Sequence, residues 1–396
     1  MKILSLSTCQ LDPVLGSGKT RLRWSQGLRD LGHTVDMIEP KEFETFFGMR
    51  RALRFRQAWG ACGFVKERLR TNDYDVIEFF GGEFGLITWQ LSKLERRPLV
   101  VAHTDGVELL ASERERAYDP PNSFSSRLRS LFSYFTHEQL SQAAFVYADA
   151  FVTGCELDRE HVLGRGLYSP HRTAVVAPGL DTEYISTPFV RQKEERAAYM
   201  GSWIARKGVD LLSRVMSNVL MRKSGLLFDV YGTGGDRDSV LTRFPAEVHD
   251  RITVHPRLSN REIAEGLSRA KLFFFPSQYE GFGMALAEAM ACSCAPVTTR
   301  TGFGAELRDG EEAVLCEFDD ARIMEQAIID LLENDERRSR IARNAWQRVQ
   351  SLSWDGNIKK LESAYHQWVS EHQQPDLKSE GQLCYNAKDE KCSRSV

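Results

Sequence analysis

One stretch in the last third of the chain constrains the fold more than any other. Residues 272–275 form a short, uninterrupted apolar block, which is typical of a strand buried in a parallel sheet. Pro276 ends this block, Gly281 and Gly283 bracket a tight loop, and residues 284–291 are good helix formers. A strand, a glycine loop and a helix in this order build a ligand site at the carboxyl end of a parallel sheet. The stretch therefore predicts an α/β fold with a binding site at this loop.

Two carboxylates frame the loop. Glu280 precedes the predicted helix, and Glu288 interrupts its otherwise apolar sequence. A single Glu on a mostly buried helix needs a partner, because burial of an unpaired charge is costly. In the simpler interpretation, Glu288 forms only a salt bridge in the core and Glu280 is a solvated loop residue. The two residues together with the glycine loop and the preceding strand favour a binding site.

The motif Pro-Ser-x-x-Glu-Gly-Phe-Gly, followed by Glu-Ala-Met-Ala, resembles the Glu-x7-Glu motif of retaining family 4 glycosyltransferases. The resemblance implies the GT-B fold, with two Rossmann-like doubly wound domains that face each other across a cleft. It also implies that Glu280, Phe282 and Gly283, with Gly281 in the same loop, bind the donor sugar, and that Glu288 binds the nucleotide ribose. A carboxylate suits both roles, because its two oxygens can accept a hydrogen bond from each hydroxyl of a sugar or ribose diol.

Composition narrows the possible partners and the compartment. The chain has 396 residues, 42% hydrophobic and 27% charged, with a formal net charge of −3, so we expect no nucleic acid partner. No apolar run approaches the roughly 18 residues of a membrane span, and the first residues do not resemble a signal peptide. The eight cysteines are scattered without a Cys-x-x-Cys pair, so we expect neither a zinc site nor a disulfide framework. A cytoplasmic location is predicted.

Alternation of strands and helices predicts two doubly wound parallel sheets. Strands are predicted at residues 2–7, 34–38, 75–80, 99–103, 151–153 and 173–177, and again at 197–201, 226–232, 251–255, 272–275, 295–299 and 313–316. The predicted parts are an acceptor-side domain (1–181), a polar linker (182–195), a nucleotide-sugar domain (196–354), a helix that crosses back to the first domain (355–370) and a disordered tail (371–396).

A second glycine-rich loop precedes the first predicted helix, which spans residues 18–31 with Trp24, Leu28 and Leu31 on its apolar face. Residues 16–20, Gly-Ser-Gly-Lys-Thr, resemble part of a phosphate loop, but Pro13 stands where the full motif requires glycine, so we reject a P-loop nucleoside triphosphatase. The segment also resembles the first glycine-rich loop of family 4 enzymes. Gly16 and Gly18 are then the positions of close backbone approach, and an ordinary turn is the alternative.

The segment 201–208 follows the first predicted strand of the second domain. A departing nucleoside diphosphate gathers negative charge, which a metal-free site must stabilise with cations and helix ends. In the resembling family a Lys precedes the last glycine of this segment, and Lys207 matches it. The family usually also has an Arg after the first glycine, where this chain has Ser202; Arg206 is the candidate substitute. A plain surface lysine is the alternative for Lys207.

Three further positions are implied by the resemblance. Gly232 lies in a glycine run like the family's loop beneath the nucleotide, although most such runs are turns. Arg257 and Leu258 match the place where backbone groups contact the base. His103 ends a predicted strand of the first domain, where the family has a His beside the sugar; a structural histidine is the alternative.

Two Asp-x-Asp triplets, 73–75 and 236–238, could hold a metal in a different glycosyltransferase fold. Turn and helix-cap roles are sufficient for both triplets, so we predict no metal and no cofactor.

Residues 49–70 contain seven basic residues among apolar ones, which predicts a basic amphipathic helix with a break near Gly60. Two interpretations stay open. The helix either has a solvated outer face, or it contacts an anionic membrane surface or an acidic acceptor. Peripheral membrane contact is therefore part of the prediction.

The resemblance implies a retaining, metal-independent transfer of a hexose from a nucleoside-diphosphate sugar to an acceptor hydroxyl. Glu280, Lys207 and His103 are the predicted catalytic residues. Two alternatives remain: a nucleotide-sugar epimerase or glycosyl phosphorylase of the same fold, and a non-catalytic nucleotide-sugar-binding partner of a transferase. The sequence leaves the sugar, the base and the acceptor open.

Overall fold

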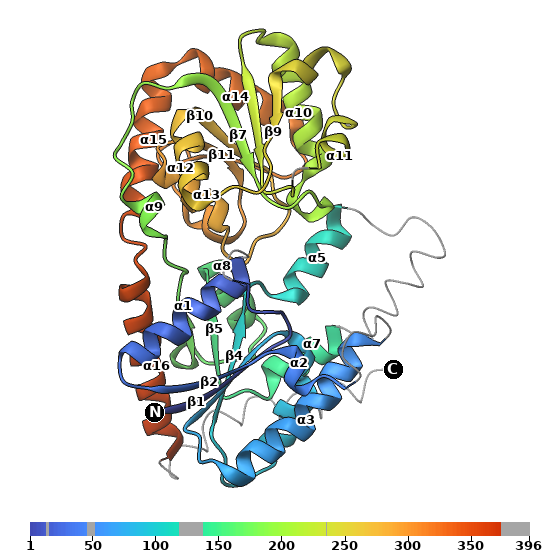
Figure 1. Ribbon diagram of the computed structural model, residues 1–396, viewed down its shortest axis with the longest axis vertical. Coiled ribbons are helices and arrows are strands. Elements are labelled where there is room, and N and C mark those ends of the chain that lie inside the picture. The colour runs from blue at the N-terminus through green and yellow to red at the C-terminus, as the bar shows by residue number, and fades with distance from the viewer. Residues whose placement is uncertain (13–15, 46–51, 119–137, 235, 374–396) are drawn as a thin grey trace. The chain divides into compact units, whose positions relative to one another are not determined.

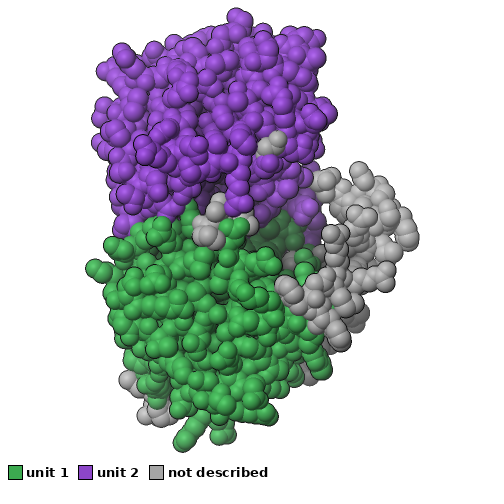
Figure 2. Space-filling model, viewed as in Figure 1, with its two compact units in different colours: residues 1–112, 121–177, 354–396 green, residues 113–120, 178–353 purple. Residues whose placement is uncertain are grey.

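The computed structural model describes residues 1–12, 16–45, 52–118, 138–234 and 236–373. The chain divides into two compact units, which Figure 2 shows in different colours. Unit 1 comprises residues 1–112, 121–177 and 354–396, and unit 2 comprises residues 113–120 and 178–353. Each unit is built on its own six-stranded sheet. No helix in the described ranges combines the length and the apolar composition that crossing a membrane requires.

The sheet of unit 1 is parallel throughout, with strand order β2-β1-β3-β4-β5-β6. Its strands are β1 (Lys2–Ser7), β2 (Thr34–Ile38), β3 (Val76–Phe80), β4 (Leu99–Thr104), β5 (Ala150–Thr153) and β6 (Thr173–Val175). All six match predicted strands to within two residues at each end. The agreement follows from the short apolar runs that parallel strands covered on both faces require.

The helices of unit 1 cover both faces of this sheet. They are α1 (Gly16–Asp30), α2 (Pro40–Phe43), α3 (Leu53–Thr71), η1 (Gly82–Phe84), α4 (Gly85–Ser92), α5 (Glu108–Tyr118), α7 (Gln139–Val146), α8 (Glu156–Gly164), η3 (Pro170–Arg172) and α16 (Trp354–Gln373). From Glu113 onward, α5 belongs to unit 2. In β1, Ile3 points into the core beneath α1 and α16, whereas Leu4 and Leu6 point into the core beneath α2, α3 and α4. This alternation places apolar residues on both faces.

Helix α16 returns the chain to unit 1 after unit 2 (Figure 1). Ile358, Leu361, Tyr365 and Trp368 are buried at helical spacing and share one core with Trp24 and Leu28 of α1. The predicted helix at 355–370 corresponds to α16. Residues 371–373, which are predicted to begin a disordered tail, are instead the last residues of this helix, and 374–396 lie outside the described residues.

The sheet of unit 2 is also parallel, with strand order β12-β11-β10-β7-β8-β9. Its strands are β7 (Glu194–Met200), β8 (Leu227–Tyr231), β9 (Ile252–Val254), β10 (Ala270–Phe275), β11 (Ala295–Thr299) and β12 (Val314–Cys316). Its helices are α9 (Thr182–Ile185), η4 (Ala205–Lys207), α10 (Val209–Arg222), α11 (Arg237–Leu241), η5 (Ala246–Arg251), α12 (Asn260–Arg269), α13 (Met284–Ala291), η6 (Gly302–Glu306), α14 (Ala321–Glu333) and α15 (Asp335–Val349). In Figure 1, α10 lies on one side of the strands and α12, α13 and α15 lie on the other.

Some local predictions differ from the structure. Leu31 follows α1 and is exposed, so it does not share the buried face of Trp24 and Leu28. Helix α3 continues through Gly60, because a glycine costs a helix only about 1 kcal/mol and Ala61 and Val65 are fully buried on its inner face. Residues 49–51 of the predicted helix lie outside the described residues.

The chain passes between the two units at two main points, near the predicted domain limits. The chain passes to unit 2 between Ala177 and Pro178 and returns to unit 1 at Trp354. The stretch predicted to be a linker, 182–195, contains α9 and the first residues of β7. This polar stretch, which contains a proline, therefore includes a short helix and the start of a strand.

A buried polar cluster joins α16 to the sheet of unit 1. The hydroxyl of Tyr365 donates a hydrogen bond to Glu78 on β3 and lies 2.6 Å from Nε2 of His103 on β4. Burial raises the pKa of Glu78. Burial also lowers the pKa of His103 to about 3, with the charge of Arg21 as a second cause. The guanidinium of Arg21 is fully buried, 4.5 Å from the ring centre of Phe80. The Tyr365 hydroxyl therefore serves two desolvated groups at once.

We predict that Tyr365→Phe weakens unit 1 by about 1–3 kcal/mol, because it leaves Glu78 and His103 buried without this partner. Hydrogen-exchange protection of peptides from β3 and β4 should fall by about 5- to 150-fold. The matched control is Tyr147→Phe, since the Tyr147 side chain is exposed. Unchanged protection in the Tyr365 variant would show that the cluster contributes nothing to stability.

Candidate functional site

Most predicted site residues lie at one edge of the sheet in unit 2. They follow the carboxyl ends of β7, β8, β9 and β10. Strands β7 and β10 are neighbours, and from this pair the chain order runs outward in opposite directions. In doubly wound sheets such a switch point opens a crevice at the carboxyl ends, where ligands bind. The loops after β7 and β10 therefore contain the residues best placed to contact a ligand.

Lys207 and Glu280 meet at this switch point. Nζ of Lys207 lies 2.7 Å and 2.8 Å from the two carboxylate oxygens of Glu280. Their side chains are mostly buried, at 16% and 9% exposed. The sequence indicates each residue separately, and the structure brings them together as an ion pair. Partial desolvation strengthens such a pair relative to one at the surface.

Backbone contacts fix the two loops against each other. The backbone N–H of Gln278 donates to the carbonyl of Arg206 at 2.9 Å, and that of Glu280 donates to Oγ1 of Thr301 at 2.8 Å. The loop after β10 is thus tied both to the loop after β7 and to the segment after β11. Thr301 was not among the predicted residues, because a single threonine beyond a strand gives no signal in the sequence.

Gly208 allows the first of these loops to pass close to the second. Its φ of +71° belongs to the left-handed region, and a Cβ at this position would lie 1.9 Å from the carbonyl oxygen of Pro276. Gly208 is followed directly by α10 and preceded directly by Lys207. A larger residue would therefore displace the segment that holds Lys207.

The glycine loop after β10 leads directly into α13. Phe282 is buried and its ring stacks on that of Phe303 at 5.1 Å. Its carbonyl oxygen accepts a hydrogen bond from the N–H of Phe303 at 2.7 Å. Gly283 precedes α13 with a φ of +97°, next to the side chain of Glu280. The positive end of the α13 dipole therefore lies beside the Lys207–Glu280 pair.

Glu288 is buried in α13, as the sequence predicted. Its charge raises the pKa of Tyr184 on α9, although burial of Tyr184 is the larger cause. Helices α9 and α13 pack against each other. The structure thus places Glu288 near Tyr184.

The other predicted residues of unit 2 flank the pair. Ser202 and Arg206 are exposed on the loop after β7. Gly232 is exposed after β8, and the N–H of Gly201 donates to the carbonyl of Tyr231, so these two strand ends are adjacent. Gly235, the last residue of the predicted glycine run, lies outside the described residues.

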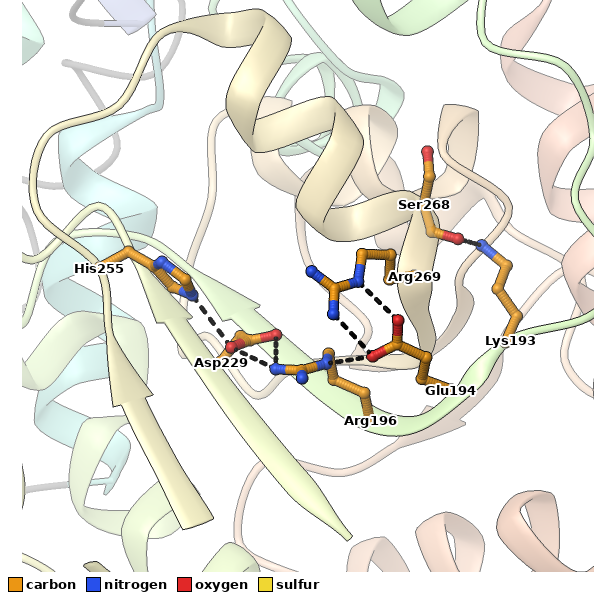
Figure 3. A network of polar contacts seen from close by, with 7 residues as sticks. All are labelled: Lys193, Glu194, Arg196, Asp229, His255, Ser268 and Arg269. Atoms are coloured by element: carbon orange, nitrogen blue, oxygen red, sulfur yellow. Dashed lines mark hydrogen bonds and ion pairs between the residues drawn. The ribbon is translucent and has the colours of Figure 1, made fainter. Parts of the chain in front are cut away.

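Arg257 is exposed after β9, and Leu258 lines a pocket of about 270 Å³. A charged network adjoins this pocket (Figure 3). Buried Asp229 of β8 contacts His255 at 3.0 Å and Arg196 at 2.8 Å. Arg196 also contacts Glu194, which pairs with Arg269 of α12.

Sequence reasoning missed this network. The signal that could have found it is Asp229, a single acidic residue within the otherwise apolar strand β8. Such a residue requires buried partners. The ring of His255 stacks on that of Tyr231 at 4.3 Å, so the network also fixes the strand ends that precede Gly232 and Arg257.

Three predicted residues lie in unit 1. Gly16 and Gly18 are in the first turn of α1, and Gly18 lies against the backbone of Asp12, where a Cβ would approach to 2.6 Å. His103 is buried, and its Nδ1 is also inaccessible and makes no hydrogen bond in the described structure. Its Nε2 faces Tyr365. The side chain of His103 is therefore not presented to solvent in this arrangement.

Comparison with known proteins shows what part of unit 2 resembles. Residues 182–348 match the family model described as Glycosyl transferases group 1. The match covers most of unit 2. The matched range contains Lys207, Glu280 and Glu288, together with the switch point between β7 and β10.

Two relatives match different lengths of the chain. The chain is 28% identical over 163 residues to one subunit of human phosphatidylinositol N-acetylglucosaminyltransferase, a match that covers 40% of this chain and 33% of that protein. It is 25% identical over 315 residues to D-inositol 3-phosphate glycosyltransferase from Corynebacterium diphtheriae, a match that covers 74% and 70% of the two chains. The first match thus spans about a third of the human relative.

A solved structure resembles both units. Sucrose-phosphate synthase from Thermosynechococcus elongatus has a TM-score of 0.75 and 17% identity, and the match covers 94% of this chain and 100% of that one. This likeness confirms the predicted fold class, two Rossmann-like domains of the GT-B type.

We predict that Gly208→Ala destabilises unit 2 by about 2–5 kcal/mol, because it combines left-handed strain with a backbone clash. Differential scanning calorimetry would measure the loss. Gly225→Ala is the matched control, since no heavy atom lies within 4 Å of a Cβ there and its φ is not positive. Equal stability of the two variants would contradict the close approach of Gly208 to Pro276.

Proposed function

We propose that the protein transfers a hexose from a nucleoside-diphosphate sugar to an acceptor hydroxyl, with retention at the anomeric carbon and without a metal ion. The single observation that most supports this proposal is the Lys207–Glu280 pair at the switch point of a glycosyltransferase group 1 domain. A cation and an acceptor-only carboxylate are thereby held where a diphosphate and a sugar would have to lie side by side.

The proposed roles follow from charge. As the glycosidic bond breaks, the nucleoside diphosphate gains negative charge. Lys207 and the N-terminal end of α13 would stabilise that charge, and this stabilisation is larger in a partly desolvated site. Glu280 would accept hydrogen bonds from sugar hydroxyls, and Glu288 from the ribose. The acceptor hydroxyl would attack on the face from which the diphosphate leaves.

Contact between Glu280 and Lys207 has a consequence for donor binding. Glu280 neutralises Lys207 at 2.7 Å, so a diphosphate that binds Lys207 has to share or replace this partner. The exchange conserves charge pairing, because the phosphate oxygens replace carboxylate oxygens around Nζ. We therefore propose that the pair holds Lys207 in a fixed position before the donor arrives.

We propose that His103 is a positioning residue of unit 1. Its ring is buried against Phe80 at 4.3 Å and contacts Tyr365, which favours a role in holding the end of β4 over direct contact with the sugar. Gly16, where no heavy atom lies within 4 Å of a Cβ, would permit close approach of ligand phosphate or sugar to the start of α1, whereas Gly18 permits the close approach of Asp12.

For the acceptor we propose a phosphorylated inositol or its lipid form. The support comes from the two relatives, whose names both contain an inositol that carries a phosphate. The first assay would combine a thermal-shift panel of nucleoside diphosphates and their sugars with turnover of the best donor in the presence of these acceptors.

Substitutions of Lys207 and Glu280 should affect donor binding and sugar transfer differently. We expect Lys207→Gln to weaken nucleoside-diphosphate binding by about 10- to 150-fold, because one charge-assisted contact is lost. Glu280→Gln should leave that Kd unchanged or lower it, yet reduce kcat/KM for transfer by at least about 100-fold. Calorimetry and initial rates would measure the two effects.

The control is Lys223→Gln, because Lys223 forms an ion pair with Glu333 away from the carboxyl edge. Normal transfer by Glu280→Gln would overturn the site assignment. Change of the donor without acceptor would favour an epimerase, and tight nucleotide binding without any turnover would favour a non-catalytic binding partner.

We also propose that α3 contacts an anionic membrane. Phe55 and Trp59 are 51% and 71% exposed, and Lys66 and Arg70 are exposed on the same outward face of the helix. The helix contains five basic residues and one acidic residue. Exposed aromatic residues beside cations match the interfacial region of an anionic bilayer.

Co-sedimentation with vesicles of phosphatidylcholine and phosphatidylserine at low salt would test this contact. We expect Lys66→Glu with Arg70→Glu, and separately Phe55→Ser with Trp59→Ser, to lower binding at least about 10-fold. Ile323→Ser is the control, since Ile323 is an exposed apolar residue on α14 of unit 2. Binding that is absent from the unmodified protein, or equal in all variants, would contradict the proposal.

A further inference from the structure

Three potential metal ligands meet in unit 1, away from the residues discussed so far. They are His33, Glu362 and His366, whose ligand atoms all lie within 4.8 Å of one another. Nε2 of His33 is 2.8 Å from Oε1 of Glu362, and Nε2 of His366 is 3.9 Å from the same oxygen. Two imidazoles and one carboxylate are a ligand set that Zn²⁺ accepts.

The backbone holds these side chains in place. Glu362 and His366 are four residues apart on α16, so they lie on one face of the helix. His33 is on the turn between α1 and β2, where its N–H donates to the carbonyl of Leu28 at 3.0 Å. Helices α1 and α16 pack against each other, so the turn and α16 are already neighbours.

The geometry requires only a small adjustment. Two ligand atoms of a tetrahedral zinc site lie about 3.3 Å apart when each is about 2.0–2.1 Å from the metal. The His366 side chain is 60% exposed, so its imidazole has room to turn toward the other two. The side chain of His33 is only 6% exposed, and a buried ligand is the one whose position should be fixed in advance.

Nδ1 of His33 lies 3.0 Å from the amino group of Met1, so Nε2 is the nitrogen of this ring that faces Glu362. The carboxylate of Glu362 supplies the negative charge that offsets the cation.

We propose that His33, Glu362 and His366 form a structural site for a divalent transition metal, Zn²⁺ first, which fastens α16 to the turn between α1 and β2. His33 precedes β2, so the site lies at the amino edge of the sheet, opposite the carboxyl edge where parallel sheets place their ligands. The site is thus independent of the proposed sugar transfer and of its outcome.

Untagged protein, stripped with chelator and dialysed, would be titrated with ZnCl₂ by calorimetry. We expect one Zn²⁺ per chain at this site, with Tm raised by about 3–8 °C at saturation. His366→Gln and His33→Gln should each weaken binding at least about 10-fold, in line with loss of one ligand. His366→Gln should fold normally, because His366 is mostly exposed.

His171→Gln is the matched control, since His171 is an exposed histidine of unit 1 outside the cluster. A Co²⁺ absorption spectrum would distinguish nitrogen and oxygen ligands from the thiolates of the chain's cysteines. Absence of Zn²⁺ binding, binding unchanged in both histidine variants, or a thiolate spectrum would each overturn the proposal.

Discussion

The arrangement of the candidate site depends on the contact between two loops that leave neighbouring parallel strands. Strands β7 and β10 pair directly, and the loops that follow them are joined by a backbone hydrogen bond from Gln278 to Arg206 and by the Lys207–Glu280 ion pair. Neither side chain alone would define a binding site. Their proximity is set by strand order, which the core of unit 2 enforces, so the chemistry of this edge is a consequence of the packing beneath it.

In unit 1, the corresponding contact is a buried polar cluster between the sheet and α16. Its sheet contains Glu78 on β3 and His103 on β4, two polar residues in strands that are otherwise apolar except for Thr104 at the end of β4. Both contact the hydroxyl of Tyr365, which comes from the far end of the chain. A polar cluster of this kind restricts how α16 can be placed, because a shift of one helical turn would leave the carboxylate and the imidazole without that hydroxyl.

Much of the fold could be predicted from the sequence, because it rests on local pattern. All twelve strands of the two sheets could be predicted, since short apolar runs between helical stretches are typical of strands in parallel sheets. The burial of Glu288 followed from its place in an apolar helix. The prediction for Leu31 was wrong because helical spacing does not reveal where a helix stops packing, and the break predicted near Gly60 overestimated the effect of a single glycine.

The features that the sequence could not supply are those that depend on distance between remote segments. Lys207 and Glu280 are each indicated by a motif of their own, but 73 positions separate them and nothing in either motif indicates a direct contact. The Asp229 network joins β7, β8, α12 and the end of β9, and its members are ordinary charged residues when taken one at a time. His33 and His366 likewise become neighbours only through the packing of α16 on α1.

Because α16 belongs to unit 1, this unit cannot complete its core until the residues after unit 2 have been synthesised. Trp24 and Leu28 emerge early from the ribosome, yet Ile358, Leu361 and Trp368, which cover them, are translated after the whole of unit 2. At about 5–20 residues per second, more than 300 intervening residues take roughly 15–70 s. Unit 2 can therefore complete its own sheet first, while the nascent unit 1 exposes an apolar groove that holdase chaperones would recognise.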